Sequence, residues 1–372
     1  MVSAPPSLPP ALQWDIFCRV VDNLGDVGVC WRLSADLAAR GQSVRLWIDQ
    51  PEPLRWMAPG ALEGDLPGVQ VRHWTDPLPA DALSGWTPGD VWIEAFGCEP
   101  APECAQRLAD RVVQGGAAPV WINLEYLSAE PYVERCHRLP SPVMSGPLKG
   151  LTKWFFYPGF SAATGGLLRE PDLAARQAAF DAQAWCQQQG LRDIQARRIS
   201  LFCYEPPVLG QVMREAARDD PRCHWLVTPG RAAQAVAAIP ALEPVCRLHA
   251  LKPLPQRDFD HLLWACDLNL VRGEDSLVRA IWAGQPFVWQ IYPQHDDAHH
   301  AKLDAFLDWL AAPASLRRFH HQWNGIAGAA GEAWPGWKTV DGWRDCVQAA
   351  RARLLTQADL SQQMIGFVAE KR

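Results

Sequence analysis

The stretch that decides the fold is WDIFCRVVDNLGDVGVCWRLSADLAARGQSVRLWID, residues 14–49. It begins with an apolar, β-rich run at 14–21, continues through the loop DNLGDVG at 22–28, and then shows a helical pattern over 29–41 that ends at a glycine. A second β-rich run follows at 43–49. Strand, helix and strand in this order predict a right-handed βαβ crossover between two parallel strands.

The same alternation continues through both halves of the chain. The further β-rich runs are 69–74, 90–96 and 118–127 in the first half and 197–205, 223–229, 245–251, 266–271 and 287–293 in the second. Because helical patterns separate most of these runs, we expect two mostly parallel sheets. The sequence therefore predicts an α/β protein with two Rossmann-like domains, at 1–178 and 179–354, that face a central cleft.

Three segments lie outside this alternation. Residues 139–166 are interrupted by proline and glycine and predict an irregular segment facing the cleft, whereas 172–190 predict a helix that leads into the second half. The chain ends in a strongly helical pattern at roughly 341–370. Two such sheets fit nucleotide-sugar transferases, periplasmic binding proteins and dehydrogenases alike, so the fold does not decide the function.

The composition disfavours several classes of protein. With 372 residues the chain is long enough for two domains. Its formal net charge of -6 disfavours a nucleic-acid partner. No uninterrupted apolar stretch of about 18 residues is present, so we expect no membrane span. The first residues do not read as an export signal, and the 11 cysteines are scattered without a C-x-x-C pair, which together predict reduced thiols in a cytoplasmic protein.

The loop after the first strand is the first candidate site. Asp22 and Asp26 flank Gly25 just beyond the carboxyl end of that strand, where α/β proteins bind ligands. The loop lacks the G-x-G-x-x-G dinucleotide pattern, and a carboxylate pair suits a cation instead. A structural interpretation stays open, in which Asp26 caps a helix that begins near Val27 and Asp22 forms an Asx-turn.

The second candidate site is VRGEDSLVRA, residues 271–280, which follows a predicted strand and opens a helix. Four residues would offer backbone N–H groups to a diphosphate at this helix start: Gly273, Glu274, Asp275 and Ser276. Arg272 and Arg279 could add positive charge. Glu274 and Asp275 are anions, so either their side chains hold sugar hydroxyls while their amides bind phosphate, or they are only carboxylates at a helix start.

Aromatic and histidine-rich segments give two weaker candidates. Phe202, Tyr204 and Phe259, together with Gln256, could supply the flat apolar face and polar edge that a nucleotide base needs, although such aromatics are more often core residues. The run YPQHDDAHH (292–300) resembles a metal cluster, with His295, Asp296, Asp297, His299 and His300. Its two aspartates fit the start of a helix equally well, so we expect no metal site there.

Several long blocks of the sequence together resemble one family. They are IFCRVVDNLGDVGVCWRLSADL, ISLFCYE, LPQRDFDHLLWACDLNLVRGEDSLVRAIWAGQPFVWQIYPQ and DDAHHAKLDAFL. Over nearly its whole length the chain resembles the arginine rhamnosyltransferases of translation elongation factor P, the EarP family. The resemblance implies a GT-B glycosyltransferase fold, in which the C-terminal helix, here about 355–372, packs back on the first domain.

The resemblance also implies an activity. Enzymes of this family transfer L-rhamnose from dTDP-β-L-rhamnose to an arginine guanidinium of elongation factor P, with inversion at the anomeric carbon and without a metal or other cofactor. The family motif D-N-x-G-D matches Asp22 and Asp26, and Asp26 stands where the proposed general base stands. This arrangement suits an arginine acceptor, because a carboxylate can bind the cation and take its proton as the new bond forms.

The resemblance assigns the remaining site residues to the donor. The motif R-G-E-D-S matches Arg272, Gly273, Glu274, Asp275 and Ser276, of which Glu274 is expected to be catalytic and Asp275 and Ser276 to lie at the diphosphate. The base-stacking aromatics correspond to Phe202, Tyr204 and Phe259, with Gln256 and Tyr292 as further donor contacts. Two alternatives stay open: a metal-independent GT-B transferase with another acceptor, and a non-catalytic protein that binds a nucleotide sugar.

Overall fold

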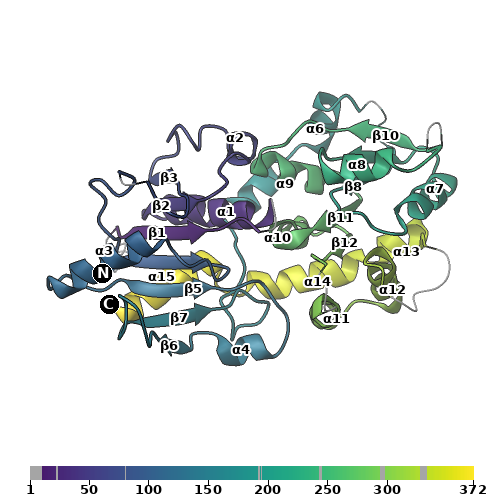
Figure 1. Ribbon diagram of the computed structural model, residues 1–372. Coiled ribbons are helices and arrows are strands. Elements are labelled where there is room, and N and C mark those ends of the chain that lie inside the picture. Colours follow the sequence, from purple (N-terminus) through teal and green to yellow (C-terminus); the bar gives the residue numbers. More distant parts are fainter. Residues whose placement is uncertain are drawn as a thin grey trace, which may run out of the picture.

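The computed structural model describes residues 11–21, 24–79, 81–191, 193, 195–242, 245–293, 298–326 and 333–372. Two sheets form separate layered units that lie side by side (Figure 1). Parallel sheets of this kind are covered by helices on both faces, which explains why their strands are nearly continuous apolar runs. The predicted α/β class with two Rossmann-like domains is confirmed.

The first sheet has seven strands in the order β3-β2-β1-β4-β5-β7-β6. Its strands are β1 (Gln13–Cys18), β2 (Ser43–Ile48), β3 (Val69–His73), β4 (Val91–Ala95), β5 (Val120–Leu124), β6 (Pro140–Pro142) and β7 (Thr152–Phe156). All neighbours pair in parallel except β6, which is antiparallel to β7. The helices of this unit are α1 (Gly25–Ala39), α2 (Leu54–Met57), α3 (Pro102–Val113) and α4 (Tyr132–Cys136).

The second sheet has five parallel strands in the order β10-β9-β8-β11-β12. They are β8 (Arg198–Leu201), β9 (His224–Val227), β10 (Arg247–Ala250), β11 (Leu268–Arg272) and β12 (Phe287–Gln290). Its helices are α7 (Leu209–Asp219), α8 (Arg231–Ala237), α9 (Gln256–Ala265), α10 (Gly273–Ala283), α11 (Ala298–Leu310), α12 (Ala314–Trp323), α13 (Trp337–Gly342) and α14 (Arg344–Leu355).

The strand order places the ligand crevice. In both sheets the chain reverses its direction of travel beside the first strand, between β1 and β4 and between β8 and β11. Open α/β sheets bind ligands outside the carboxyl ends of the strands at such a switch point. The helices that begin there are α1 and α10, and these two helices contact each other across the gap between the sheets.

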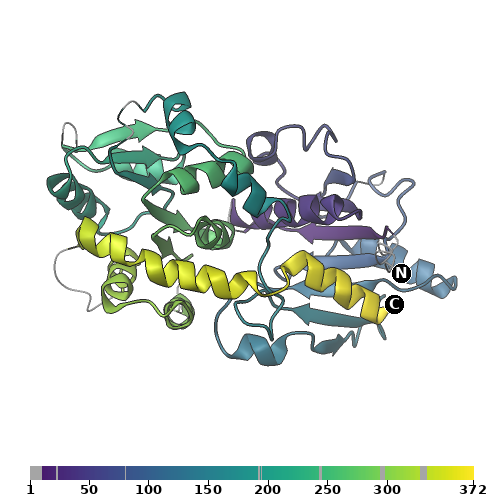
Figure 2. The same ribbon diagram turned by 180° about the vertical axis from the view of Figure 1, so that it is seen from behind.

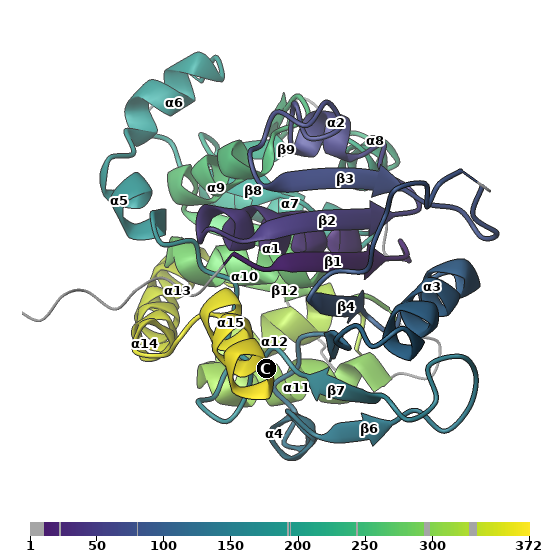
Figure 3. The same cartoon turned by 90° about the vertical axis from the view of Figure 1, so that its left-hand side faces the viewer.

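The C-terminal helices join the two units. The linker between the sheets contains α5 (Leu173–Ala178) and α6 (Ala182–Gln188), and the chain ends in α15 (Leu360–Lys371). Figure 2 shows α14 and α15 in yellow, running across the back of both units, and Figure 3 shows α15 beside the first sheet. Leu360, Met364, Phe367 and Val368 of α15 are buried in the core of that sheet. The boundaries 1–178 and 179–354 stay a prediction.

Several local expectations are wrong. The first helix begins at Gly25 rather than at 29, with Leu24 as its N-cap, so Asp26 does not cap it but lies in its first turn. The segment 139–166 is not wholly irregular, because β6 and β7 lie within it; glycine and proline around these short strands hid them. The run 172–190 forms two helices, because the Asp181 carboxylate accepts hydrogen bonds from the backbone N–H groups of Gln183 and Ala184 and starts α6.

The helical end of the chain is likewise divided. Residues 356–359 separate α14 from α15, and the Asp359 side chain accepts a hydrogen bond from the backbone N–H of Gln362 at the start of α15. All 11 cysteines are free thiols. Among the described residues, no helix combines the length and the apolar character that a membrane crossing requires.

Candidate active site

Two adjoining cavities lie between the sheets at the carboxyl ends of the strands. Cavity A has a volume of about 300 Å³ and is lined mainly by the second unit, with α2 and Arg32 of α1 on its other side. Cavity B has a volume of about 260 Å³ and is lined by both units. Gly25 and Gly273, the first residues of α1 and α10, line both cavities, so the two spaces meet at the starts of these helices.

The aromatic end of cavity A has the character of a base-binding cleft. Phe202, which follows β8, and Phe259, on α9, contact each other edge to face with ring centroids 5.4 Å apart. The chain around Thr228 and Pro229, just after β9, lines the same cavity. A mostly apolar pocket with a few polar groups is the usual form of a small-molecule site. The two phenylalanines therefore form an aromatic wall of cavity A on which a flat ring can stack.

Next to these aromatic rings, cavity A contains a buried cation. Arg272 is only 6% exposed and is the N-cap of α10. Its guanidinium lies 4.7 Å from the Phe202 ring centroid and 4.4 Å from that of Tyr204, while its Nε and Nη1 have no hydrogen-bond partner among the described residues. A buried cation without an anion, at the start of a helix whose first N–H groups have no partner within the helix, suits a diphosphate.

The first turn of α10 is built for close approach. Gly273 has φ +69°, a conformation that glycine adopts without strain, and its carbonyl accepts a hydrogen bond from Trp289 Nε1 at 2.9 Å. The Ser276 hydroxyl donates to the Arg272 carbonyl and lines cavity A. The predicted donor residues Arg272, Gly273 and Ser276 are thus brought together on one wall.

Three other predicted donor residues lie differently. Tyr204 is only 2% exposed and lies under Arg272 rather than on the wall of cavity A. Its ring is edge to face with that of Tyr292, which lines cavity B and is 42% exposed. Gln256 lines cavity A, but its Nε2 donates to the Gly28 carbonyl at 2.9 Å and so ties α9 to α1. Tyr204 thus packs under the Arg272 guanidinium, Tyr292 packs against Tyr204, and Gln256 connects the two units across cavity A.

The two acids of the R-G-E-D-S motif are both paired with groups outside α10. Glu274 Oε2 accepts from the backbone N–H of Leu127 at 2.8 Å, and its Oε1 accepts from Lys302 Nζ at 2.8 Å. Asp275 Oδ1 accepts from Arg32 Nε at 2.9 Å. Both carboxylates are thereby neutralised by cations from other elements. An anion can therefore approach α10 despite the two acids in its first turn.

Cavity B combines carboxylates with aromatic rings. Asp26 is 2% exposed, lines this cavity together with Glu274, and accepts a hydrogen bond from the backbone N–H of Val21 at 2.8 Å. Phe96 and Tyr126 line it as a stacked pair, with ring centroids 4.5 Å apart and an angle of 13° between the ring planes. Carboxylates beside aromatic faces form an environment that attracts a cation.

A lysine already occupies part of this environment. Lys302 Nζ, besides contacting Glu274, lies 5.8 Å from the Tyr126 ring centroid. Phe96 adopts φ +59°, which is unfavourable for a residue with a side chain, and its N–H donates to the Leu124 carbonyl at 2.7 Å. Backbone strain of this kind concentrates at functional sites. The strained turn aims the Phe96 ring at Tyr126.

Some predicted residues cannot be placed. Asp22 lies outside the described residues, as do His295, Asp296 and Asp297. His299 lines cavity B and is buried. Within the described part of the chain, no group of three or more His, Cys, Asp or Glu side chains could hold a metal ion.

Sequence reasoning missed Arg32, Phe96, Tyr126 and Lys302. Phe96 and Tyr126 could have been found, because they follow β4 and β5 at the carboxyl ends of predicted parallel strands. Nothing in the sequence indicates that Arg32 on α1 contacts the opposite unit. Lys302 lies on α11, whose position depends on the packing of the whole second unit.

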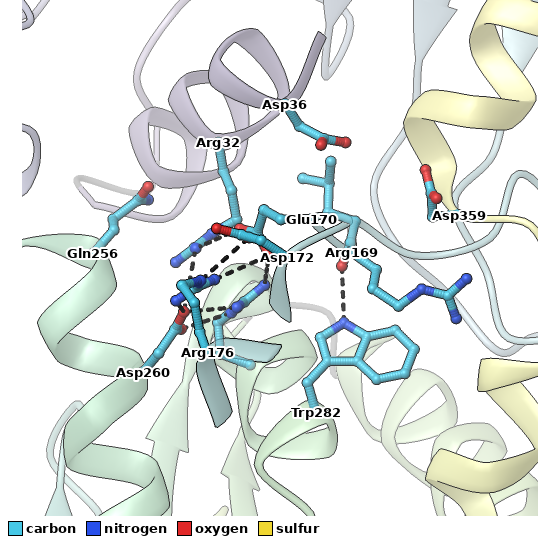
Figure 4. A network of polar contacts seen from close by, with 12 residues as sticks. Arg32, Asp36, Arg169, Glu170, Asp172, Arg176, Gln256, Asp260, Trp282 and Asp359 are labelled. Atoms are coloured by element: carbon cyan, nitrogen blue, oxygen red, sulfur yellow. Dashed lines mark hydrogen bonds and ion pairs between the residues drawn. The ribbon is translucent and has the colours of Figure 1, made fainter. Parts of the chain in front are cut away.

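Arg32 belongs to a buried network of charges between the two units (Figure 4). Its Nη1 donates to Glu170 of the linker at 2.9 Å, and Glu170 also accepts from Arg279 Nη1 at 2.8 Å. Arg279 is paired at two points with Asp260 of α9, at 2.7 Å each. Although burial alone would raise the pKa of Glu170, Arg279 and Arg32 hold it well below its usual value. The linker acid is therefore a stable anion between two arginines.

Comparison with known proteins agrees with this geometry. The family model described as "Elongation-Factor P (EF-P) rhamnosyltransferase EarP" matches residues 14–369. A protein-arginine rhamnosyltransferase of Pseudomonas aeruginosa is 41% identical over 390 residues, covering 96% of this chain and 99% of the relative. One of Neisseria meningitidis is 35% identical over 395 residues, covering 97% and 98%.

Solved structures give the same result. One described as "Structural basis for EarP-mediated arginine glycosylation of translation elongation factor EF-P" has a TM-score of 0.60 and 30% identity, covering 97% of this chain and all of that one. The spinosyn forosaminyltransferase SpnP has a TM-score of 0.52 at 11% identity, covering 96% of this chain and all of that one, and bears on the fold alone. The GT-B fold class predicted from the sequence is confirmed.

Proposed function

This chain belongs to the EF-P rhamnosyltransferase family EarP, and on that premise we propose that it transfers L-rhamnose from dTDP-β-L-rhamnose to an arginine guanidinium of translation elongation factor P. The product is an N-glycosylated arginine, formed with inversion at the anomeric carbon. The observation that carries this proposal is the pair of adjoining cavities, one apolar and cationic, the other acidic and aromatic, that meet at Gly25 and Gly273.

Cavity A has the properties of a site for the nucleotide diphosphate. We assign the thymine to the aromatic wall that Phe202 and Phe259 form together in cavity A, where an aromatic base gains stacking contacts. We assign the diphosphate to the start of α10, where Arg272 and the amides of Gly273 to Ser276 would face its charge. Tyr204 supports this site by packing against the buried Arg272 guanidinium rather than by touching the base.

Cavity B has the properties of a site for the acceptor arginine. A guanidinium is a planar cation that pairs with carboxylates and stacks on aromatic faces. Asp26 and Glu274 offer the carboxylates, and the stacked pair of Phe96 and Tyr126 offers the aromatic face. Because cavity B meets cavity A at the start of α10, an arginine held there faces the sugar end of a donor bound in cavity A.

The reaction then needs one base and a stabilised leaving group. A guanidinium nitrogen attacks the anomeric carbon of rhamnose, the bond from that carbon to the diphosphate oxygen breaks, and dTDP leaves with the electron pair. Asp26 is the proposed base: it binds the guanidinium, whose pKa lies above about 12, and takes the proton that the attacking nitrogen loses. Arg272 and the α10 amides stabilise the charge that develops on dTDP, a role that other enzymes give to a metal ion.

Glu274 has a position suited to the reacting atoms. Its carboxylate faces cavity B and is held by Leu127 and Lys302. A carboxylate held in this way can order the sugar and the acceptor without serving as a nucleophile. We therefore propose that Glu274 orients the reacting groups while Asp26 handles the proton.

The acceptor also suggests where the protein acts. Elongation factor P is a translation factor, so we propose that this chain works in the cytoplasm. Intact-mass measurement of elongation factor P, incubated with this protein and dTDP-L-rhamnose, tests the activity: we expect a gain of one deoxyhexose, unchanged in the presence of EDTA. An unmodified factor beside a rhamnosylated small-molecule acceptor would contradict the proposed acceptor, and loss of the gain in EDTA would contradict metal independence.

A further inference from the structure

Arg32 is a residue of the first unit whose side chain reaches the donor cavity of the second. It lies on α1, yet its guanidinium lines cavity A together with Arg272, Gly273 and Asp275. Its side chain is only 5% exposed. In Figure 4 it extends from the purple helix α1 toward Glu170 and Asp260. Cavity A is therefore complete only while α1 lies against α10.

The guanidinium of Arg32 contacts three acids. Its Nε and Nη2 donate to the two oxygens of Asp275 at 2.9 and 3.4 Å, and its Nη1 donates to Glu170 at 2.9 Å. Asp260 is 3.9 Å from Nη1. The planar guanidinium thus uses three nitrogen atoms at once to contact acids on different sides. A lysine carries its charge on one nitrogen atom and could not make all of these contacts.

The three acids do not depend on Arg32 equally. Asp260 keeps a two-point pair with Arg279 and a contact with Arg176 at 3.3 Å. Glu170 keeps Arg279 at 2.8 Å and Arg176 at 3.7 Å. For Asp275, in contrast, Arg32 is the single cationic partner within the described part of the chain. Gln256 Nε2, at 3.5 Å, is a weaker, neutral partner. Removing Arg32 therefore leaves Asp275 as the acid without a cation.

Asp275 lies where an unpaired anion would oppose the binding of a diphosphate. It lies in the first turn of α10 and lines cavity A, as does the buried Arg272 that precedes this helix. A partly buried carboxylate without a partner repels a neighbouring anion strongly, because little water is present to screen it. Two groups could then compete for Arg272: the diphosphate and the Asp275 carboxylate.

We propose that Arg32 is a positioning residue for the donor, which pairs with Asp275 from the opposite unit and so frees Arg272 and the start of α10 for the diphosphate. This inference rests on the proposed function, because it presumes a nucleotide diphosphate in cavity A. The contact between α1 and α10 then has a role in donor binding, because Arg32 of the first unit completes the diphosphate site of the second unit.

A double-mutant cycle with dTDP as the probe tests this role. In the full-length chain, Arg32→Met should weaken dTDP binding by about tenfold or more, because it leaves the Asp275 charge unpaired. In the Asp275→Asn background, the same Arg32→Met change should alter dTDP affinity by less than about threefold, because Asp275 then carries no charge and Glu170 and Asp260 keep other cations. Calorimetric titration of the four proteins gives these ratios.

Arg176→Met is the matched control. Arg176 contacts Glu170 and Asp260 in the same network but not Asp275, so its loss should change dTDP affinity by less than about twofold. If the network had only a structural role, Arg32→Met and Arg176→Met would weaken dTDP binding to the same extent. Thermal unfolding of both variants measures the loss of stability separately.

The outcomes separate this inference from the proposed function. Wild-type protein that binds dTDP, with Arg32→Met equally harmful in both backgrounds, would overturn the role through Asp275 and leave the proposed function intact. Unchanged dTDP affinity in Arg32→Met would overturn it as well. A wild-type chain that binds no dTDP would contradict the proposed donor itself, and this inference with it.

Discussion

The Glu274 carboxylate and the backbone N–H of Leu127 lie 2.8 Å apart and join the two units at the candidate active site. Leu127 follows β5 of the first sheet, whereas Glu274 is in the first turn of α10 in the second. The other Glu274 oxygen contacts Lys302. The Glu274 side chain thus lines cavity B, connects the two units and forms an ion pair with Lys302.

Glu274→Gln separates these tasks. The amide oxygen can still accept from Leu127, but the charge that faces cavity B and pairs with Lys302 is lost. We expect the maximal rate of transfer to fall by at least about tenfold, without recovery at high donor concentration, because the charge acts on the reacting groups. Steady-state kinetics at varied donor concentration measure this. A rate that saturating donor restores would instead make Glu274 part of donor binding.

Phe259→Ala should show the opposite behaviour. Removing one ring of the aromatic wall is expected to weaken dTDP binding by about 1–3 kcal/mol, in the range of base stacking elsewhere. Much of the rate should return at high donor concentration, because stacking on the base contributes equally before and during the reaction. Titration of dTDP and saturation kinetics test both points. A sharply lowered melting temperature with no kinetic rescue would show that Phe259 serves the core alone.

Tyr126→Leu tests the aromatic face of cavity B. A leucine keeps apolar volume but removes the aromatic face, so we expect the acceptor KM to rise by the equivalent of about 1–2 kcal/mol while dTDP affinity stays within twofold. Tyr132→Leu is the control, because Tyr132 on α4 is similarly exposed, at 40% against 37%, and packs on Tyr157. Equal effects of the two substitutions on the acceptor KM would argue against a guanidinium site at Tyr126.

Asp36 gives a prediction about pH. It lies on α1, where burial raises its pKa to about 6 despite the hydrogen bond and the charge from Arg40. The folded chain therefore holds this proton more tightly than the unfolded chain, whose aspartates titrate near about 4. Its contribution to stability is present below pH 4 and is lost as the pH rises to about 6.

The difference in unfolding free energy between wild type and Asp36→Asn isolates this group. We expect the wild type to lose about 2 kcal/mol of stability relative to Asp36→Asn between pH 4 and 6, as a shift of roughly two pKa units implies over that range. Urea titrations at both pH values measure it. A constant difference would mean that Asp36 does not hold its proton between α1 and α15.

The sequence anticipated the sheets better than the details at their ends. Long apolar runs separated by helical patterns specify parallel strands, and every strand predicted in this way is present. β7 was missed because this short strand lies between Gly150 and Pro158, and the glycine and proline on either side of it suggested a loop. The start of α1 was placed too late because glycine and aspartate favour loops, although both occur in its first turn.

Some residues of the candidate site could be predicted from the sequence and others could not. Residues at the carboxyl ends of strands, such as Arg272 and Phe202, could be identified from the parallel pattern alone. The burial of Tyr204 under Arg272 could not, because alternation along a strand does not tell which face will receive a cation. Nor could the pairing of Arg32 with Asp275, since it joins residues 243 positions apart in the chain.

The central claim is that Asp26 serves the acceptor and the proton transfer while the donor binds elsewhere, and Asp26→Asn tests it most directly. Asparagine keeps the shape of the side chain and its ability to accept from Val21, but it cannot take a proton. The measurement is single-turnover transfer to elongation factor P at saturating dTDP-L-rhamnose, together with donor affinity by titration. We expect transfer to fall by at least about a hundredfold, the lower range for a lost general base, with donor affinity within a few-fold of wild type. A parallel collapse of donor binding, or transfer at the wild-type rate, would contradict the account.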